Sequence, residues 1–131
     1  IVIGKKLGEN AKSSILTRGL KEMIALGKSM GGKRKTFYGL SGIGDLSLSC
    51  NSIISRNTKL GINLGKGINL RNILKNNLLA EGLNSCESIC NLANKYDVDL
   101  PICFAIKNIL DGKCINNVIS GLLSRPNQYE N

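Results

Sequence analysis

The sequence predicts an all-α fold, a single helical domain of six to eight helices over residues 1–131. Apolar residues recur at spacings of three and four along several segments, as they do on one face of a helix. No segment alternates apolar and polar residues for long enough to form a half-buried strand. With 131 residues, 42% of them hydrophobic, the chain is long enough to bury one core.

The first half of the chain contains three predicted helices. Asn10 is a suitable N-cap for the first, whose apolar stripe runs to Leu26. Residues 36–40 form a short turn. A second helix follows the glycine-rich run at Gly42, and a third begins after Ser55.

The second half contains shorter predicted helices, each bounded by a residue that caps or breaks a helix. The predicted elements are residues 68–74 with Asn69 as the cap, a helix that opens at Asn84 or Ser85, a helix with Pro101 in its first turn that ends at Gly112, and residues 115–123.

The charge of the chain is strongly basic, at +9 with no histidine. Clustered Lys and Arg are typical of nucleic-acid binding, so a basic helical module for nucleic acid is one alternative. The densest cluster, Lys33 to Lys35, follows two glycines that end a helix, where cations complement the helix dipole. Two Phe and three Tyr supply few stacking surfaces. We therefore expect no specific nucleic-acid partner.

The five cysteines contain no C-x-x-C pair, and the chain has no histidine to complete a typical zinc site. An odd number of cysteines without signal-peptide anatomy indicates reduced thiols in a cytoplasmic protein. No apolar run approaches the roughly 18 residues of a membrane span. We expect no metal site and mostly buried thiols. The cysteines are Cys50, Cys86, Cys90, Cys103 and Cys114.

Residues 42–57 gather the most distinctive polar chemistry. They read G-I-G-D-L-S-L-S-C-N-S-I-I-S-R-N and contain an acid (Asp45), a guanidinium (Arg56) and an amide (Asn57). On one unbroken helix, Asp45 and Arg56 would lie roughly 16 Å apart. A bend near residues 50–52 would instead turn both groups toward one pocket.

A second helix that begins at Arg56 would make Ser55 its N-cap. The free amides of its first turn, with Arg56 and Asn57 beside them, would then attract an anion such as phosphate. Asp45 on the wall of that site would recognise hydroxyl groups or position a catalytic ammonium group. The residues alone also allow ordinary roles, because Ser-Arg-Asn is a common helix start and Asp45 suits a first turn.

Further motifs lie on both sides of this stretch, and they cover nearly the whole chain. They are G-E-N-A-K-S-S-I-L-T-R-G-L-K-E-M at 8–23, G-L-S-G-I-G-D-L-S-L-S-C at 39–50, S-R-N at 55–57, L-G-x-G at 64–67, A-E-G at 80–82, D-L-P-I at 99–102 and S-R-P at 124–126. In this order they resemble the C-terminal domain of bacterial-type NAD(P)-dependent glycerol-3-phosphate dehydrogenase.

The resemblance implies an all-helical substrate domain, as in 6-phosphogluconate dehydrogenase-like proteins. In the intact enzyme it would pack against an N-terminal dinucleotide-binding domain, and the enzyme could be a homodimer. Such an enzyme interconverts dihydroxyacetone phosphate and glycerol 3-phosphate, a precursor of glycerophospholipids, with NAD or NADP as cofactor. The residues that select between NAD and NADP belong to the dinucleotide-binding half.

The resemblance also implies roles for individual residues. Asp45 matches the acid that contacts substrate and helps to hold the catalytic lysine. Ser55, Arg56 and Asn57 match the substrate-binding S-R-N, with Arg56 also near the cofactor. The positions matched to cofactor binding near the E-G step are Leu79 and Glu81, and Ser49 is a weaker candidate where the family has threonine or serine.

Two features of the resembling family are not found in this sequence. No G-x-G-x-x-G lies at a strand-to-helix turn, and the catalytic lysine falls before the position matched by Ile1. Lys5 and Lys6 do not match its position. We therefore expect the chain to be inactive alone, either as a trimmed part of an enzyme or as the product of a broken gene. A non-catalytic helical remnant of a split gene is the alternative.

Overall fold

The computed structural model describes residues 1–76, 78 and 80–126, and this part contains eight α-helices and one π-helical turn but no strand. The all-α prediction is therefore confirmed. The elements are α1 (Glu9–Ser29), α2 (Arg34–Phe37), η1 (Leu40–Gly44), α3 (Asp45–Asn51), α4 (Arg56–Gly65), α5 (Leu70–Lys75), α6 (Glu81–Tyr96), α7 (Pro101–Leu110) and α8 (Ile115–Leu123).

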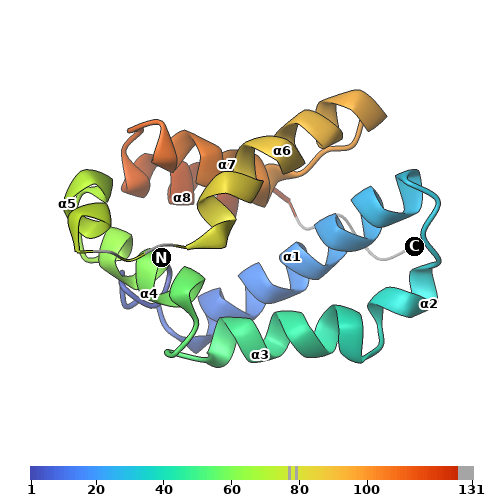
Figure 1. Cartoon of the computed structure of the whole chain (residues 1–131), viewed down its shortest axis with the longest axis horizontal. Coiled ribbons are helices and arrows are strands. Elements are labelled where there is room, and N and C mark those ends of the chain that lie inside the picture. The colour runs from blue at the N-terminus through green and yellow to red at the C-terminus, as the bar shows by residue number, and fades with distance from the viewer. Residues whose placement is uncertain (77, 79, 127–131) are drawn as a thin grey trace.

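The long helix α1 is the centre of the fold and contacts α2, α3, α6 and α7. In Figure 1 it crosses the middle of the molecule, with α3 along one side and α6 along the other. Helices α4 and α5 lie at one end, and the turn that begins at Ile1 lies against α4. The chain thus wraps α1 rather than forming separate layers.

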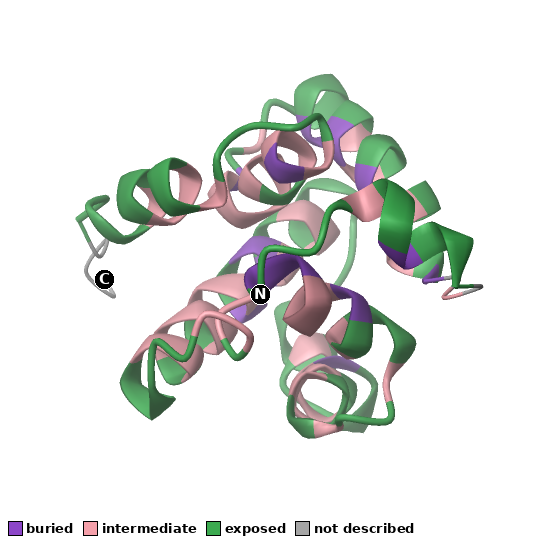
Figure 2. Ribbon diagram, turned by 90° about the vertical axis from the view of Figure 1, so that its left-hand side faces the viewer, coloured by how far each residue is buried: buried purple, intermediate pink, exposed green. Residues whose placement is uncertain are grey.

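The buried residues are few and lie on the inward faces of the helices (Figure 2). One apolar cluster joins α4, α5 and the start of α6 through Leu60, Leu64, Ile73 and Ala80. The largest side chains that are almost fully buried among the described residues are those of Leu100, which precedes α7, and Cys90, which lies within α6.

Most predicted helices are present, and their starts differ in three places. Asn10 does not cap α1, because Gly8 adopts a positive φ and lets the helix begin at Glu9. The segment expected as a turn over residues 36–40 overlaps two helical elements, because its first two residues belong to α2 and its last residue begins η1. The helix expected from Asn84 or Ser85 begins earlier, at Glu81.

The predicted caps in the other helices are confirmed. Ser55 caps α4, Asn69 caps α5 by accepting from the amide of Asn72 at 2.9 Å, and Pro101 is the first residue of α7. Gly112 follows the end of α7 with a positive φ, as a helix-ending glycine commonly does. Local capping chemistry therefore decides these boundaries.

The carboxylate of Glu22 supplies a cap that the sequence did not reveal. Leu100 precedes α7 and has no side-chain acceptor for the free amides of that helix. Glu22, buried on α1, accepts from the amide of Ile102 at 2.6 Å and from the amide of Cys103 at 3.2 Å. These two hydrogen bonds fix the middle of α1 to the beginning of α7 across 80 residues of sequence.

Burial disfavours the charged form of Glu22 more than the two amides favour it, so its pKa is raised above the usual 4.5. Between 4.5 and the folded-state pKa, the folded chain keeps a proton that the unfolded chain has released. The contribution of Glu22 to the free energy of unfolding is therefore full below pH 4.5 and decreases as the pH rises through the folded-state pKa.

Glu22→Gln removes this titration while keeping one acceptor for the amides of α7. The stability advantage of wild type over the variant should be largest below pH 4.5 and should shrink as the pH rises through the raised folded-state pKa, as measured by urea unfolding. Glu87→Gln, which changes an exposed acid on α6, is the control for the loss of one carboxylate. An advantage that grows with rising pH would contradict the assignment.

Candidate functional site

The acid of the central motif begins a helix. The π-helical turn η1 runs directly into α3, whose first residue is Asp45. Backbone amides where η1 meets α3 donate to carbonyls of η1, at Leu40 and Gly42, and the Asp45 side chain is exposed to solvent. Single π-helical turns occur frequently at functional sites. Asp45 is thus held on a defined turn and available to a ligand.

The predicted bend between α3 and α4 is present. Ser52 leaves the helix with extended backbone angles, and α4 begins at Arg56. The Ser55 hydroxyl accepts from the amide of Thr58 at 3.4 Å, as an N-cap does. The Thr58 hydroxyl in turn donates to the carbonyl of Ser49 at 2.8 Å, which ties the first turn of α4 to the last turn of α3.

The first turn of α4 also contacts the start of α6. Oδ1 of Asn57 accepts from the amide of Gly82 at 3.1 Å, across 25 residues of sequence. The S-R-N motif and the E-G step, which resemble substrate-binding and cofactor-binding positions, are therefore neighbours. Glu81, exposed, is the first residue of α6, while Leu79 lies outside the described residues.

Asp45 and Arg56 are both exposed, but Asp45 begins α3 whereas Arg56 begins α4, on the other side of the bend. The seven residues of α3 place about 10 Å of helix between Asp45 and the bend. The predicted pocket shared by Asp45 and Arg56 remains a prediction. What the structure brings together is Ser55, Asn57 and Gly82.

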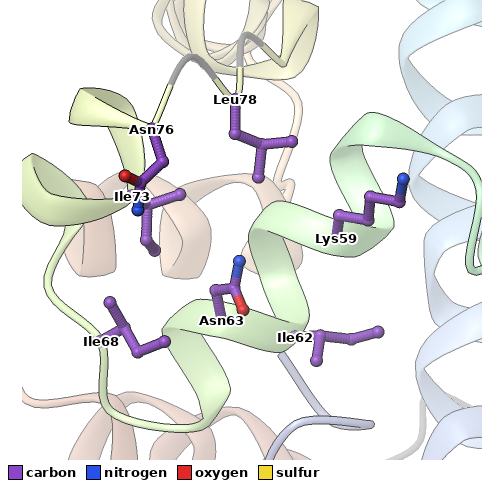
Figure 3. A pocket seen from close by; sticks show the side chains of 7 residues that line it. All are labelled: Lys59, Ile62, Asn63, Ile68, Ile73, Asn76 and Leu78. Carbon is purple, nitrogen blue, oxygen red and sulfur yellow. The ribbon is translucent and has the colours of Figure 1, made fainter.

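A hollow of about 310 Å³ lies beside α4 and α5. Figure 3 shows Asn63 of α4, Ile73 of α5 and Leu78 arranged around it. Lys59 also lines this hollow, and it follows Arg56 by three residues, so the two cations lie on the same side of α4. A second hollow of about 430 Å³ lies between α7 and α8, next to the Asp99–Arg125 ion pair.

The cysteines of the chain differ in environment. Cys50 and Cys103 are half-buried, whereas Cys114 is exposed. Hydrogen bonds from the backbone amides of Asn117 and Asn116 lower the pKa of Cys114. All five thiols are free, and Cys86 and Cys90 are buried. Burial, with the neighbouring carboxylate of Glu22, raises the pKa of Cys103 to about 12, so its thiolate is strongly disfavoured. Within the described ranges, no three Cys, Asp or Glu side chains converge in a way that could hold a metal ion.

The sequence did not single out three residues that organise this region: Glu22, Thr58 and Gly82. Their roles depend on partners elsewhere in the chain, at 80, 9 and 25 residues of separation. The sequence did contain a signal for Glu22 and Gly82. Leu100 and Ala80 precede α7 and α6, and neither side chain can cap the helix that follows it. A helix start without a local cap indicates an acceptor from another element.

Among residues 1–76, 78 and 80–126, no helix combines the length and the apolar character that a membrane-spanning helix needs.

Comparison with known proteins gives a consistent result. A family model described as the C-terminus of NAD-dependent glycerol-3-phosphate dehydrogenase matches residues 1–119. A glycerol-3-phosphate dehydrogenase (NAD(P)+) of Parvibaculum lavamentivorans is 41% identical over 99% of this chain and 40% of its own length. The protein of the same name from Vesicomyosocius okutanii is 42% identical over 100% of this chain and 41% of its own length.

A solved structure is similar as well. The crystal structure of glycerol-3-phosphate dehydrogenase from Coxiella burnetii matches with a TM-score of 0.90 and 36% identity, over 95% of this chain and 39% of that one. The chain therefore spans about two fifths of the length of the relatives it matches.

Proposed function

Because this chain belongs to the family of NAD-dependent glycerol-3-phosphate dehydrogenase C-termini, we propose that it is the substrate-side part of such an enzyme. The proposed reaction interconverts dihydroxyacetone phosphate and glycerol 3-phosphate with NAD or NADP. The observation that carries the proposal is the hydrogen bond between Asn57 and Gly82, because it joins the two motifs that resemble substrate-binding and cofactor-binding positions.

The residues at the start of α4 fit a phosphate-bearing ligand. The amides of Arg56 and Asn57 are the first two of α4 and have no acceptor within the helix. The exposed guanidinium of Arg56 adds a planar donor that can bind two phosphate oxygens at once. Both the proposed substrate and the dinucleotide carry phosphate, so these groups suit either one.

In the proposed reaction, NAD(P) supplies the hydride chemistry at C2 of the three-carbon substrate. This chain binds and orients the substrate through Ser55, Arg56 and Asn57. Asp45 provides a negative charge that would hold a protonated lysine from the other part of the enzyme, and this lysine would manage the proton at the substrate oxygen. Glu81, with Leu79, would contact the cofactor.

We also propose that a dinucleotide-binding domain covers the surface around this motif. The four most exposed large apolar side chains of the described part all lie within residues 40–54: Leu40, Leu48, Ile53 and Ile54 are 89%, 71%, 70% and 79% exposed. The other exposed large apolar side chains of that part reach at most 51%. Such a local concentration of apolar surface is typical of an interface.

The first test is activity. The chain alone should not oxidise NADH in the presence of dihydroxyacetone phosphate, because the proposed hydride-carrier site and lysine are supplied by the other domain. Fusion behind the N-terminal part of the Parvibaculum lavamentivorans relative should restore turnover. The N-terminal part alone is the control. Turnover by the isolated chain, or an inactive but folded fusion, would count against the proposal.

The second test concerns Arg56. In the fused enzyme, Arg56→Lys keeps the charge but loses the two-pronged donor, so KM for dihydroxyacetone phosphate should rise about tenfold. Arg71→Lys, on an exposed arginine of α5, is the matched control and should leave KM unchanged. Equal values of KM for the two variants would remove Arg56 from the substrate site.

The third test concerns the apolar surface. Changing Ile53→Ser together with Ile54→Ser should weaken binding of the separately expressed N-terminal part at least tenfold, as measured by calorimetry. The free energy of unfolding of the chain itself should change by less than about 0.5 kcal/mol, because both side chains are already exposed. Ile68→Ser with Ile106→Ser is the control of equal composition. Unchanged binding would assign this surface to another partner.

A further inference from the structure

The start of α6 lacks a cap of its own. Ala80 precedes the helix with extended backbone angles, and its side chain has no acceptor for the free amides of the first turn. The amide of Gly82 instead donates to Oδ1 of Asn57 at 3.1 Å. Asn57, in the first turn of α4, therefore serves as the N-cap of a different helix.

Gly82 is required by the closeness of this contact. A Cβ atom at position 82 would lie 2.8 Å from Oδ1 and 3.2 Å from Cγ of Asn57. The first distance is shorter than real Cβ contacts, so any side chain at position 82 would displace the carboxamide of Asn57. The absence of a side chain at Gly82 is what allows the two helix starts to meet.

The hydrogen bond also fixes which way the Asn57 amide points. A backbone N–H can only donate, so the atom that faces Gly82 must be the oxygen. Within the described part of the chain, Nδ2 of Asn57 donates to no acceptor, and the residue is exposed. Asn57 therefore has both Nδ2 donors available to a ligand, as the neighbouring guanidinium of Arg56 has its own, and the pair favours ligand oxygens that accept hydrogen bonds.

We propose that Gly82 is a positioning residue that acts through Asn57, so that the S-R-N turn and the E-G step form one binding unit. This inference rests on the proposed function, because it assigns substrate to the first turn and cofactor to the second. Since each turn holds the other in place, breaking the hydrogen bond weakens the binding of both ligands. Loss of the Asn57 donors alone weakens the binding of substrate only.

Amide hydrogen exchange of the 131-residue chain tests the contact without any need for activity. Asn57→Ala should speed exchange of the Gly82 amide about tenfold, because its acceptor is lost. Asn57→Asp keeps an acceptor oxygen and should leave that rate near the wild-type value. Equal rates in wild type and Asn57→Ala would overturn the inference, whatever the fate of the proposed function.

Kinetics of the fused enzyme test the coupling. Gly82→Ala should raise KM for both dihydroxyacetone phosphate and NADH about tenfold, whereas Asn57→Asp should raise KM for dihydroxyacetone phosphate with little change for NADH. Gly19→Ala is the matched control, since a Cβ there meets no atom within 4 Å. If Gly82→Ala raises only one KM, or neither, the two turns do not act as one unit.

The two outcomes are separable. Suppose that the fusion turns over no substrate but that Asn57→Ala still speeds exchange of the Gly82 amide. That result would refute the proposed function, while the assignment of Asn57 as the cap of α6 would stand. An active fusion in which Gly82→Ala behaves like Gly19→Ala would refute the positioning role and leave the proposed function intact.

Discussion

The carboxylate of Glu22 joins the middle of α1, the central helix of the fold, to the start of α7. Because α1 touches α2, α3, α6 and α7, its position decides where the two halves of the chain meet. A buried acid is costly unless its oxygens are satisfied. Here two amides of α7, which has no local cap, donate to the Glu22 oxygens. One interaction therefore satisfies both the buried carboxylate and the free amides of the helix.

A second helix start is capped from another element in the same way. The side chain of Asn57 accepts from an amide of α6, as Glu22 accepts from amides of α7. In both cases a helix begins after an apolar residue and obtains its acceptor from an earlier helix. The second case lies at the candidate site, so the device that completes α6 also sets the geometry of the S-R-N turn. If the proposed function is correct, stability and ligand recognition there would depend on the same hydrogen bond.

Local capping explains how much of this structure the sequence could predict. The helices that begin at Ser55, Asn69 and Pro101 were placed correctly because the side chain that defines each start is adjacent in sequence. The start of α6 was placed too late, since Ala80 carries no capping group and the acceptor comes from Asn57. The cap of α4 at Ser55 could be predicted from its motif, whereas the contacts of Gly82 and Glu22 are made across 25 and 80 residues of sequence and could not.

The arrangement of the candidate site explains why a chain of this length would need a second part for catalysis. Arg56 and Asn57 present donors at the start of α4, and Asp45 is a negative charge at the far end of α3, but all three side chains are exposed. Electrostatic groups act strongly on a substrate only where water is excluded. The apolar side chains at 40, 48, 53 and 54 lie in the same stretch of sequence as these groups and are largely exposed. A domain packed on these apolar side chains would exclude water from the site and would also supply its own reacting groups. Domain packing and catalysis would then depend on the same surface.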